Sequence, residues 1–134
     1  MSAVVDEVDE KVLFEQTGPL AIARLNAEKS LNALSLDMID LLYPQLLAWQ
    51  RDESVKVVWL EGAGSRAFCA GGDIVGLYHS MTDAEAGARN RVAEDFFTRE
   101  YTLDYLLYRY GKPIICWAEG VVMGGGGGLL AGCS

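Results

Sequence analysis

Two short apolar runs near the start of the chain are separated by a turn dipeptide. The runs KVLFEQT and LAIARLN lie on either side of Gly18-Pro19 within residues 11–26. Apolar positions that alternate with polar ones around a Gly-Pro turn are typical of two half-buried strands. We therefore expect a β-hairpin over this segment.

The next segment carries apolar residues at helical spacing. They are Leu36, Ile39, Leu42, Tyr43, Leu46 and Leu47. Ser35 is suited to cap a helix and Asp37 adds negative charge to its first turn, so the pattern predicts an amphipathic helix to about Arg51. Pro44 lies inside this segment. A proline in a helix interior removes a backbone hydrogen bond at a cost of about 3 kcal/mol, and we expect a kink or a break at Tyr43.

Two further runs, VKVVWLE at residues 55–61 and IICWAEG at residues 114–120, are strand-like. The first is rich in β-branched residues, which predicts a strand buried on both faces. Between the two runs, the T-x-x-E capping box of Thr82 and Glu85 predicts a long helix through Leu103. Another helix is predicted to begin near the end of the chain. The order strand, strand, helix, strand, helix, strand indicates an α/β fold.

The composition excludes several classes of protein. Of 134 residues, 51% are hydrophobic and 22% are charged, which excludes intrinsic disorder for the chain as a whole. No apolar run approaches the ~20 residues needed to span a bilayer. Eleven Lys and Arg against nineteen Asp and Glu give a formal charge of -8, the wrong sign for binding a phosphate backbone. We therefore expect neither a membrane nor nucleic acid as a partner.

The N-terminal segment and the cysteines bear on location. The first eighteen residues carry acidic residues where a secretory signal would carry Lys or Arg. The three cysteines are widely spaced, which favours neither a disulfide framework nor a metal-binding pair. From these observations we expect a cytoplasmic protein with reduced cysteines.

Two glycine-bearing loops follow the two strand-like runs. They are FCAGGD at residues 68–73 and MGGGGG at residues 123–128. Backbone N–H groups at the start of a helix have no intrahelical partner and favour negative charge, and glycine lets a ligand approach them. Two such groups could converge on one carbonyl oxygen and stabilise the oxyanion that it becomes, each contributing about 3 kcal/mol. The alternative is that the glycines only permit tight turns or close helix packing.

Other candidate motifs carry less information. Residues 62–67 match the G-x-G-x-x-A form of a dinucleotide-binding loop, but no helical period follows them. Cys69 could pair with His79, the sole histidine, as a nucleophile, although a small packed cysteine is the more common interpretation. With one histidine and scattered cysteines, we expect no metal site.

Four acidic residues recur at helical spacing in the second half of the chain: Glu94, Asp95, Glu100 and Asp104. This pattern is most simply explained as a solvated helix face. Glu100 is the exception that we select as a candidate, because Phe96, Phe97 and Tyr101 place it at the margin of an apolar surface.

Five segments of the chain resemble the crotonase, or enoyl-CoA hydratase/isomerase, superfamily. They are LNALSLDMI (31–39), YPQL (43–46), AFCAGGDI (67–74), FFTREYTLDY (96–105) and KPIICWAEGVVMGGGGGL (112–129). Within the superfamily, REYTLDY and YPQL are most similar to the 3-hydroxyisobutyryl-CoA hydrolase branch. The resemblance implies repeated ββα units wound as a spiral, incomplete in this chain. Residues 1–11 would be an N-terminal tail, and residues 12–134 the amino-terminal part of an acyl-CoA-binding domain.

The resemblance also implies roles for individual residues. The backbone N–H groups of Gly72 and Gly125 would form an oxyanion hole around the thioester carbonyl, with Gly125 and Glu100 contacting the acyl portion of the substrate. Lys29 would lie near the CoA phosphates, and Ala70 would present its backbone to the CoA moiety. Coenzyme A enters as part of the substrate, so no separate cofactor is expected.

Two departures from the family pattern shape the functional hypotheses. Hydratases carry a glutamate where this chain has Gly128, which disfavours hydration. The hydrolase branch takes its catalytic acid and base from a segment that would lie beyond residue 134. We therefore expect an acyl-CoA thioester hydrolase that acts on 3-hydroxyisobutyryl-CoA in valine degradation and whose carboxylate base lies outside this chain.

Two alternatives remain open. One is an enoyl-CoA hydratase or isomerase, and the other is a non-catalytic CoA-binding or oligomerising fragment. In each case we expect an exposed apolar face, covered by a homo-oligomer partner or by a missing carboxy-terminal segment.

Overall fold

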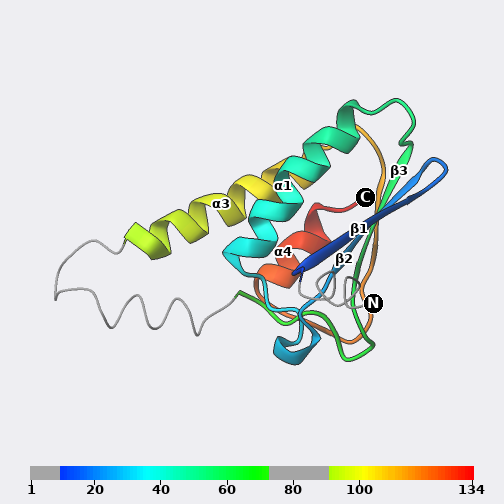
Figure 1. The fold of residues 1–134 in the computed structure, drawn as a ribbon. Helices are drawn as coiled ribbons and strands as arrows, with labels where there is room; N and C mark the ends of the chain where they lie inside the picture. Colours follow the sequence, from blue (N-terminus) through cyan, green and yellow to red (C-terminus); the bar gives the residue numbers. More distant parts are fainter. Residues whose placement is uncertain (1–9, 73–90) are drawn as a thin grey trace, which may run out of the picture.

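The computed structural model describes residues 10–72 and 91–134 (Figure 1). A four-stranded sheet has the order β1-β2-β3-β5. Its strands are β1 (Val12–Thr17), β2 (Leu20–Leu25), β3 (Val57–Gly62) and β5 (Ile114–Trp117). Strands β1 and β2 pair antiparallel, so the predicted hairpin is confirmed, whereas β2, β3 and β5 pair in parallel. The predicted α/β fold is therefore present.

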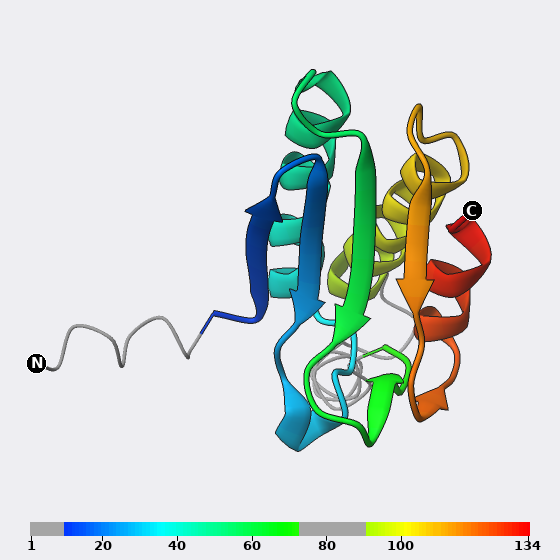
Figure 2. The ribbon, with the colours of Figure 1, turned by 90° about the vertical axis from the view of Figure 1, so that its right-hand side faces the viewer.

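The α-helices of the described residues lie on one face of this sheet, as Figure 2 shows. They are α1 (Leu36–Arg51), α3 (Arg91–Tyr108) and α4 (Gly125–Gly132). Parallel strands need crossover connections of this kind, and α1 supplies the one between β2 and β3. The core forms where the helices meet the sheet, with Leu25, Val58 and Ile114 from the strands among its fully buried members.

Helix α1 begins and ends where the sequence predicts. The Met38 N–H donates a hydrogen bond to Ser35 Oγ at 3.2 Å, so Ser35 is the N-cap. Pro44 lies inside the helix, which continues to Arg51. Of the two outcomes expected at Tyr43, the break is therefore wrong, and the kink stays a prediction. Buried apolar residues on both sides of the proline, Leu42 and Leu46 among them, offset the lost backbone bond.

A second, two-stranded sheet joins the loops at one end of the molecule. It consists of β4 (Ala67–Cys69) and β6 (Val121–Val122), which pair in parallel. The loop at residues 62–67 therefore leads into a strand and not into a helix, as expected for a chain without a dinucleotide-binding loop.

Asn32 fixes these loops to one another. It is buried, and its side-chain amide donates to the Ala63 and Ala67 carbonyls at 3.1 and 2.9 Å. Its side-chain oxygen accepts from the Ala27 N–H at 2.9 Å, just before the short 3-10 helix η2 (Glu28–Ser30). One side chain thus connects the segment after β2 with the segment between β3 and β4.

The predicted exposed apolar face is present, and it explains why β3 is not buried on both faces as expected. Val58 and Leu60 of β3 are buried, but Trp59 is only partly covered. The Trp59 ring stacks on Trp117, whose side chain is 58% exposed, with 5.7 Å between ring centroids.

Among the described helices, none is long and apolar enough to cross a membrane.

Candidate functional site

The two predicted glycine loops and Glu100 meet at the start of helix α4. A Cβ atom placed on Gly125 would lie 2.6 Å from Glu100 Oε1, 3.5 Å from the backbone nitrogen of Gly72 and 3.5 Å from Leu34 Cδ2. A side chain at position 125 would therefore collide with the Glu100 carboxyl. Three residues that are far apart in the sequence and were selected from it thus surround one small space.

Backbone contacts hold the two loops in this position. The Leu34 N–H donates to the Gly71 carbonyl at 2.6 Å, and the Met123 N–H donates to the Cys69 carbonyl at 3.2 Å. Gly71 and Gly124 have φ values of 114° and 46°, which side chains rarely adopt. The glycines at these two positions are required by the backbone conformation itself.

Two backbone donors at this junction have no hydrogen-bond acceptor in the described part of the chain: the N–H groups of Gly72 and Gly125. Later N–H groups of α4 do have acceptors: those of Gly126 and Gly128 donate to the Met123 and Gly124 carbonyls at 2.8 and 3.1 Å. Gly125 is the first residue of α4, where unpaired N–H groups and the helix dipole favour a negatively charged or polarised oxygen.

The expectation of a solvated face on α3 is wrong for Asp104, whereas the exception made for Glu100 is supported. Glu100 is only 8% exposed, and one carboxyl oxygen of Asp104, Oδ1, is buried and has no hydrogen-bond partner among the described residues. Burial raises the pKa of the Glu100 carboxyl, and the negative charge of Asp104 raises it further. Burial alone raises the pKa of Asp104. Asp95, in contrast, is exposed and bound to Arg99 at 3.1 Å, as a solvated face requires.

Close packing of α3 on α4 explains why both acids are covered. A Cβ on Gly128 would lie 2.9 Å from Asp104 Oδ2, and one on Gly132 would lie 2.9 Å from Leu107 Cβ. Glycines at 125, 128 and 132 of α4 therefore accommodate residues 100, 104 and 107 of α3. The sequence pattern did not single out Asp104 as a site residue. The signal for it is its position one turn after Glu100, between Leu103 and Leu107, which are both buried.

The two residues proposed to contact CoA lie in adjoining segments. Lys29 is exposed in η2, and the Ala70 N–H donates to the carbonyl of Leu31, the residue that caps η2, at 3.0 Å. Ala70 is partly buried and immediately precedes the first glycine pair. Both residues are thus on the side of the site formed by η2 and β4, and their roles stay predictions.

The interpretation of Cys69 as a packed residue is supported. Its thiol is buried in the core, and loss of solvent is the main cause that raises its pKa, so the nucleophilic thiolate is disfavoured. His79 and the capping box of Thr82 and Glu85 lie outside the described residues. Within residues 10–72 and 91–134, no group of three or more His, Cys, Asp or Glu is arranged to hold a metal ion.

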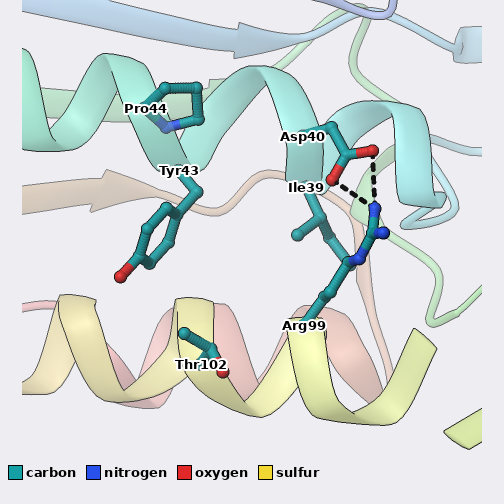
Figure 3. Close-up of a pocket in the computed structure, with 6 residues that line it drawn as sticks. All are labelled: Ile39, Asp40, Tyr43, Pro44, Arg99 and Thr102. Carbon is teal, nitrogen blue, oxygen red and sulfur yellow. Dashed lines mark hydrogen bonds and ion pairs between the residues drawn. The ribbon is translucent and has the colours of Figure 1, made fainter. Parts of the chain in front are cut away.

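A cavity of about 270 Å³ lies between α1 and α3, away from this junction (Figure 3). Its lining residues are Ile39, Asp40, Tyr43, Pro44, Arg99 and Thr102. The Arg99 guanidinium binds the Asp40 carboxylate at 2.9 Å across the cavity, and Figure 3 shows this pair spanning the two helices. Because the one cation is already paired with a carboxylate, the cavity presents no unpaired charge for a ligand.

Residues 20–134 match the family model described as Enoyl-CoA hydratase/isomerase. The chain belongs to this family. Over 120 residues it is 45% identical to the mitochondrial 3-hydroxyisobutyryl-CoA hydrolase of Danio rerio and 42% identical to that of Homo sapiens. These alignments cover 89% and 90% of the chain, which spans about 30% of the length of either relative.

Solved structures of family members share the fold. A carnitinyl-CoA dehydratase from Mycobacterium thermoresistibile superposes with a TM-score of 0.86 at 39% identity, covering 94% of this chain and 36% of that one. An enoyl-CoA hydratase from Rhodobacter sphaeroides gives 0.79 at 32% identity, covering 89% and 34%. The crotonase-like fold predicted for the chain is confirmed, and the chain covers only part of it.

The names of the relatives overturn the prediction of a cytoplasmic location. The 3-hydroxyisobutyryl-CoA hydrolases of Danio rerio, Xenopus tropicalis and Homo sapiens are all named as mitochondrial. Reduced cysteines indicate a reducing environment, but neither they nor an acidic composition distinguish one reducing compartment from another. The cysteine count and the acidic N-terminal residues therefore do not determine the compartment of this chain.

Proposed function

We propose that this family member provides the carbonyl-binding part of an acyl-CoA thioester hydrolase whose substrate is 3-hydroxyisobutyryl-CoA. The observation that carries the proposal is the pair of Gly72 and Gly125 N–H groups, which have no acceptor among the described residues and lie beside the buried Glu100. The names of the relatives at 45% and 42% identity support the choice of substrate.

In this proposal the thioester carbonyl oxygen accepts hydrogen bonds from both N–H groups. Water adds through its oxygen to the carbonyl carbon while a base takes one of its protons. The C–S bond then breaks, the sulfur takes up a proton and leaves as the CoA thiol, and the acyl group leaves as the carboxylic acid. Each N–H donor stabilises the oxyanion by about 3 kcal/mol.

The base is proposed to be a carboxylate outside residues 1–134. Position 128, where a hydratase carries its glutamate, is glycine here, and Glu100 is assigned in this proposal to contact with the acyl portion of the substrate. Lys29 and the Ala70 backbone are proposed to contact the CoA moiety. Coenzyme A is part of the substrate in this scheme and not a separate cofactor.

Two other functions each have one observation in their favour. Structural neighbours named as an enoyl-CoA hydratase and a carnitinyl-CoA dehydratase favour hydration or dehydration of acyl-CoA. A relative from Neurospora crassa, named small ribosomal subunit protein mS47, is 38% identical over 120 residues and favours a binding role. That alignment covers 90% of this chain and 23% of the relative.

One pair of assays separates these functions. The complete gene product is incubated with 3-hydroxyisobutyryl-CoA, with free thiol measured, and separately with crotonyl-CoA, with loss of the enoyl absorbance measured. Thiol release without hydration is the expected result. Hydration without thiol release would contradict the proposal, and CoA binding by calorimetry with neither reaction would favour the binding role.

A further inference from the structure

Glu100 and Asp104 form a pair of carboxyls on one face of α3. They are four residues apart, a spacing that brings side chains together on a helix. Both lie against glycines of α4, Glu100 at Gly125 and Asp104 at Gly128. Asp104 is therefore the acidic residue one turn along the same face of α3 from Glu100, whose carboxyl borders the Gly72 and Gly125 N–H groups.

The charge of Glu100 matters because of where it lies. Its Oε1 atom and the Gly72 nitrogen are both within 3.5 Å of the point at which a Cβ of Gly125 would lie. A carbonyl oxygen that accepts from the Gly72 and Gly125 N–H groups would lie close to Glu100 and would gain negative charge during reaction. An ionised Glu100 would oppose that charge, whereas a protonated one could donate a third hydrogen bond to it, as buried neutral acids do in other oxyanion holes.

We propose that Asp104 is a positioning residue that acts through Glu100, keeping the proton on that carboxyl so that its O–H faces the oxygen held by Gly72 and Gly125. The inference rests on the proposed function only for the identity of that oxygen. In this proposal the negative charge of the pair lies on Asp104, one turn farther from the N-terminus of α4, and from there it raises the pKa of Glu100.

The elements packed against α3 bring few competing charges. Residues 125–132 of α4 include no ionisable side chain. Strand β4 contributes Cys69, whose thiol stays neutral because burial raises its pKa. Helix α1 contributes Tyr43 and Asp40, both of which line the separate cavity, where Asp40 is bound to Arg99. Among the described residues, Asp104 is therefore the anion that Glu100 experiences most directly.

The first test measures the proton itself. Side-chain carboxyl signals of Glu100 are followed by carbon-13 NMR through a pH titration of the 134-residue chain and of Asp104→Asn, which keeps the shape and removes the charge. Glu100 is expected to titrate at lower pH in the variant. Asp95→Asn, on the exposed face of the same helix, is the control and is expected to leave that midpoint unchanged. An unchanged midpoint in Asp104→Asn would overturn the proposal.

The second test links the proton to ligand binding. The probe is a ketone analogue of 3-hydroxyisobutyryl-CoA, in which a methylene replaces the thioester sulfur, and free CoA is the comparison. Affinity for the analogue is expected to fall with rising pH, and in Asp104→Asn to fall at lower pH, with a loss of up to about tenfold at neutral pH. An analogue that binds wild type no more tightly than free CoA contradicts the proposed function, whatever the NMR midpoints show.

Glu100→Gln keeps the test decisive if Asp104→Asn does not fold. Glutamine donates a hydrogen bond at every pH, so the affinity of this variant for the analogue is expected to lose its dependence on pH. A dependence that persists in Glu100→Gln would overturn the role of Glu100 and, with it, that of Asp104. In the double variant, Asp104→Asn is expected to have no further effect on the pH profile.

Discussion

Three consecutive glycines of α4 should respond differently to the same substitution. Alanine at Gly125 places its methyl 2.6 Å from the Glu100 carboxyl oxygen, and alanine at Gly126 places it against the Cys69 carbonyl. At Gly127, the described residues outside the helix's own backbone place no atom within 4 Å of the methyl. The Glu100 carboxyl is the end of a flexible side chain and can move, but the Cys69 carbonyl is backbone of β4. The same methyl therefore tests function at one position and packing at the next.

The magnitudes follow from these contacts. Replacing a helical glycine with alanine favours folding by about 0.5–1 kcal/mol, which Gly127→Ala should gain in full. Overpacking costs about 1–3 kcal/mol, so Gly126→Ala should lose stability even after that gain. Gly125→Ala should change stability by no more than about 1 kcal/mol, because the displaced group can move, and yet should lose binding of the ketone analogue.

Urea unfolding measures the stabilities, and calorimetry with the analogue measures binding. Gly127→Ala is the matched control, since it adds the same methyl one residue from Gly126 and is expected to bind as wild type does. Wild-type affinity in Gly125→Ala would refute the assignment of the carbonyl site. A loss of stability in Gly127→Ala equal to that in Gly126→Ala would refute the packing argument.

Three further outcomes are expected. Asn32→Ala should lower the free energy of unfolding by about 1–3 kcal/mol, measured in urea, because it leaves buried carbonyls without donors; an unchanged value would show that water replaces the amide. Iodoacetamide should modify Cys116 faster than Cys69 by mass spectrometry, because a hydrogen bond from Cys133 lowers the pKa of Cys116 whereas burial raises that of Cys69; equal rates would contradict this. Asp104→Asn should gain stability relative to wild type between pH 4 and pH 7. Burial raises the pKa of Asp104 in the folded protein, so wild type loses stability as the pH rises above the pKa that Asp104 has in the unfolded chain. Asparagine does not ionise and avoids this loss. A stability difference that is independent of pH in urea unfolding would contradict the burial of that carboxyl.

The parts of the structure that the sequence predicted are those that local chemistry determines. Gly18-Pro19 marks a turn, Ser35 caps a helix, and two glycine loops after strands place N–H groups at the same edge of a sheet. The break predicted at Tyr43 was wrong because the backbone bond lost at Pro44 is offset by the packing of α1 on the core, which the sequence around the proline does not show. The periodicity of α1 was correct, but the continuity of the helix was not predictable from the proline alone.

The features that were missed depend on partners distant in the sequence. The spacing of Glu100 and Asp104 shows that they share a helix face, but only the glycine surface of α4 determines that this face is covered. The pairing of β4 with β6 involves short segments more than fifty residues apart and has no local signal. Trp59 and Trp117 form part of an apolar face, and the sequence of β3 could not indicate that this face lacks a cover within the described residues.

The glycine content of α4 makes its order conditional on its neighbours. Glycine disfavours a helix by about 1 kcal/mol per residue relative to alanine, and this short helix begins with four of them. Its stability must therefore come from docking on α3 and β4, and not from its own residues. The Gly125 donor is consequently in place only while α3 is docked, so a ligand that binds this donor would also stabilise the docked helix. The affinity of a ligand carbonyl for the Gly125 N–H and the local order of α4 therefore both measure the equilibrium between docked and undocked α4.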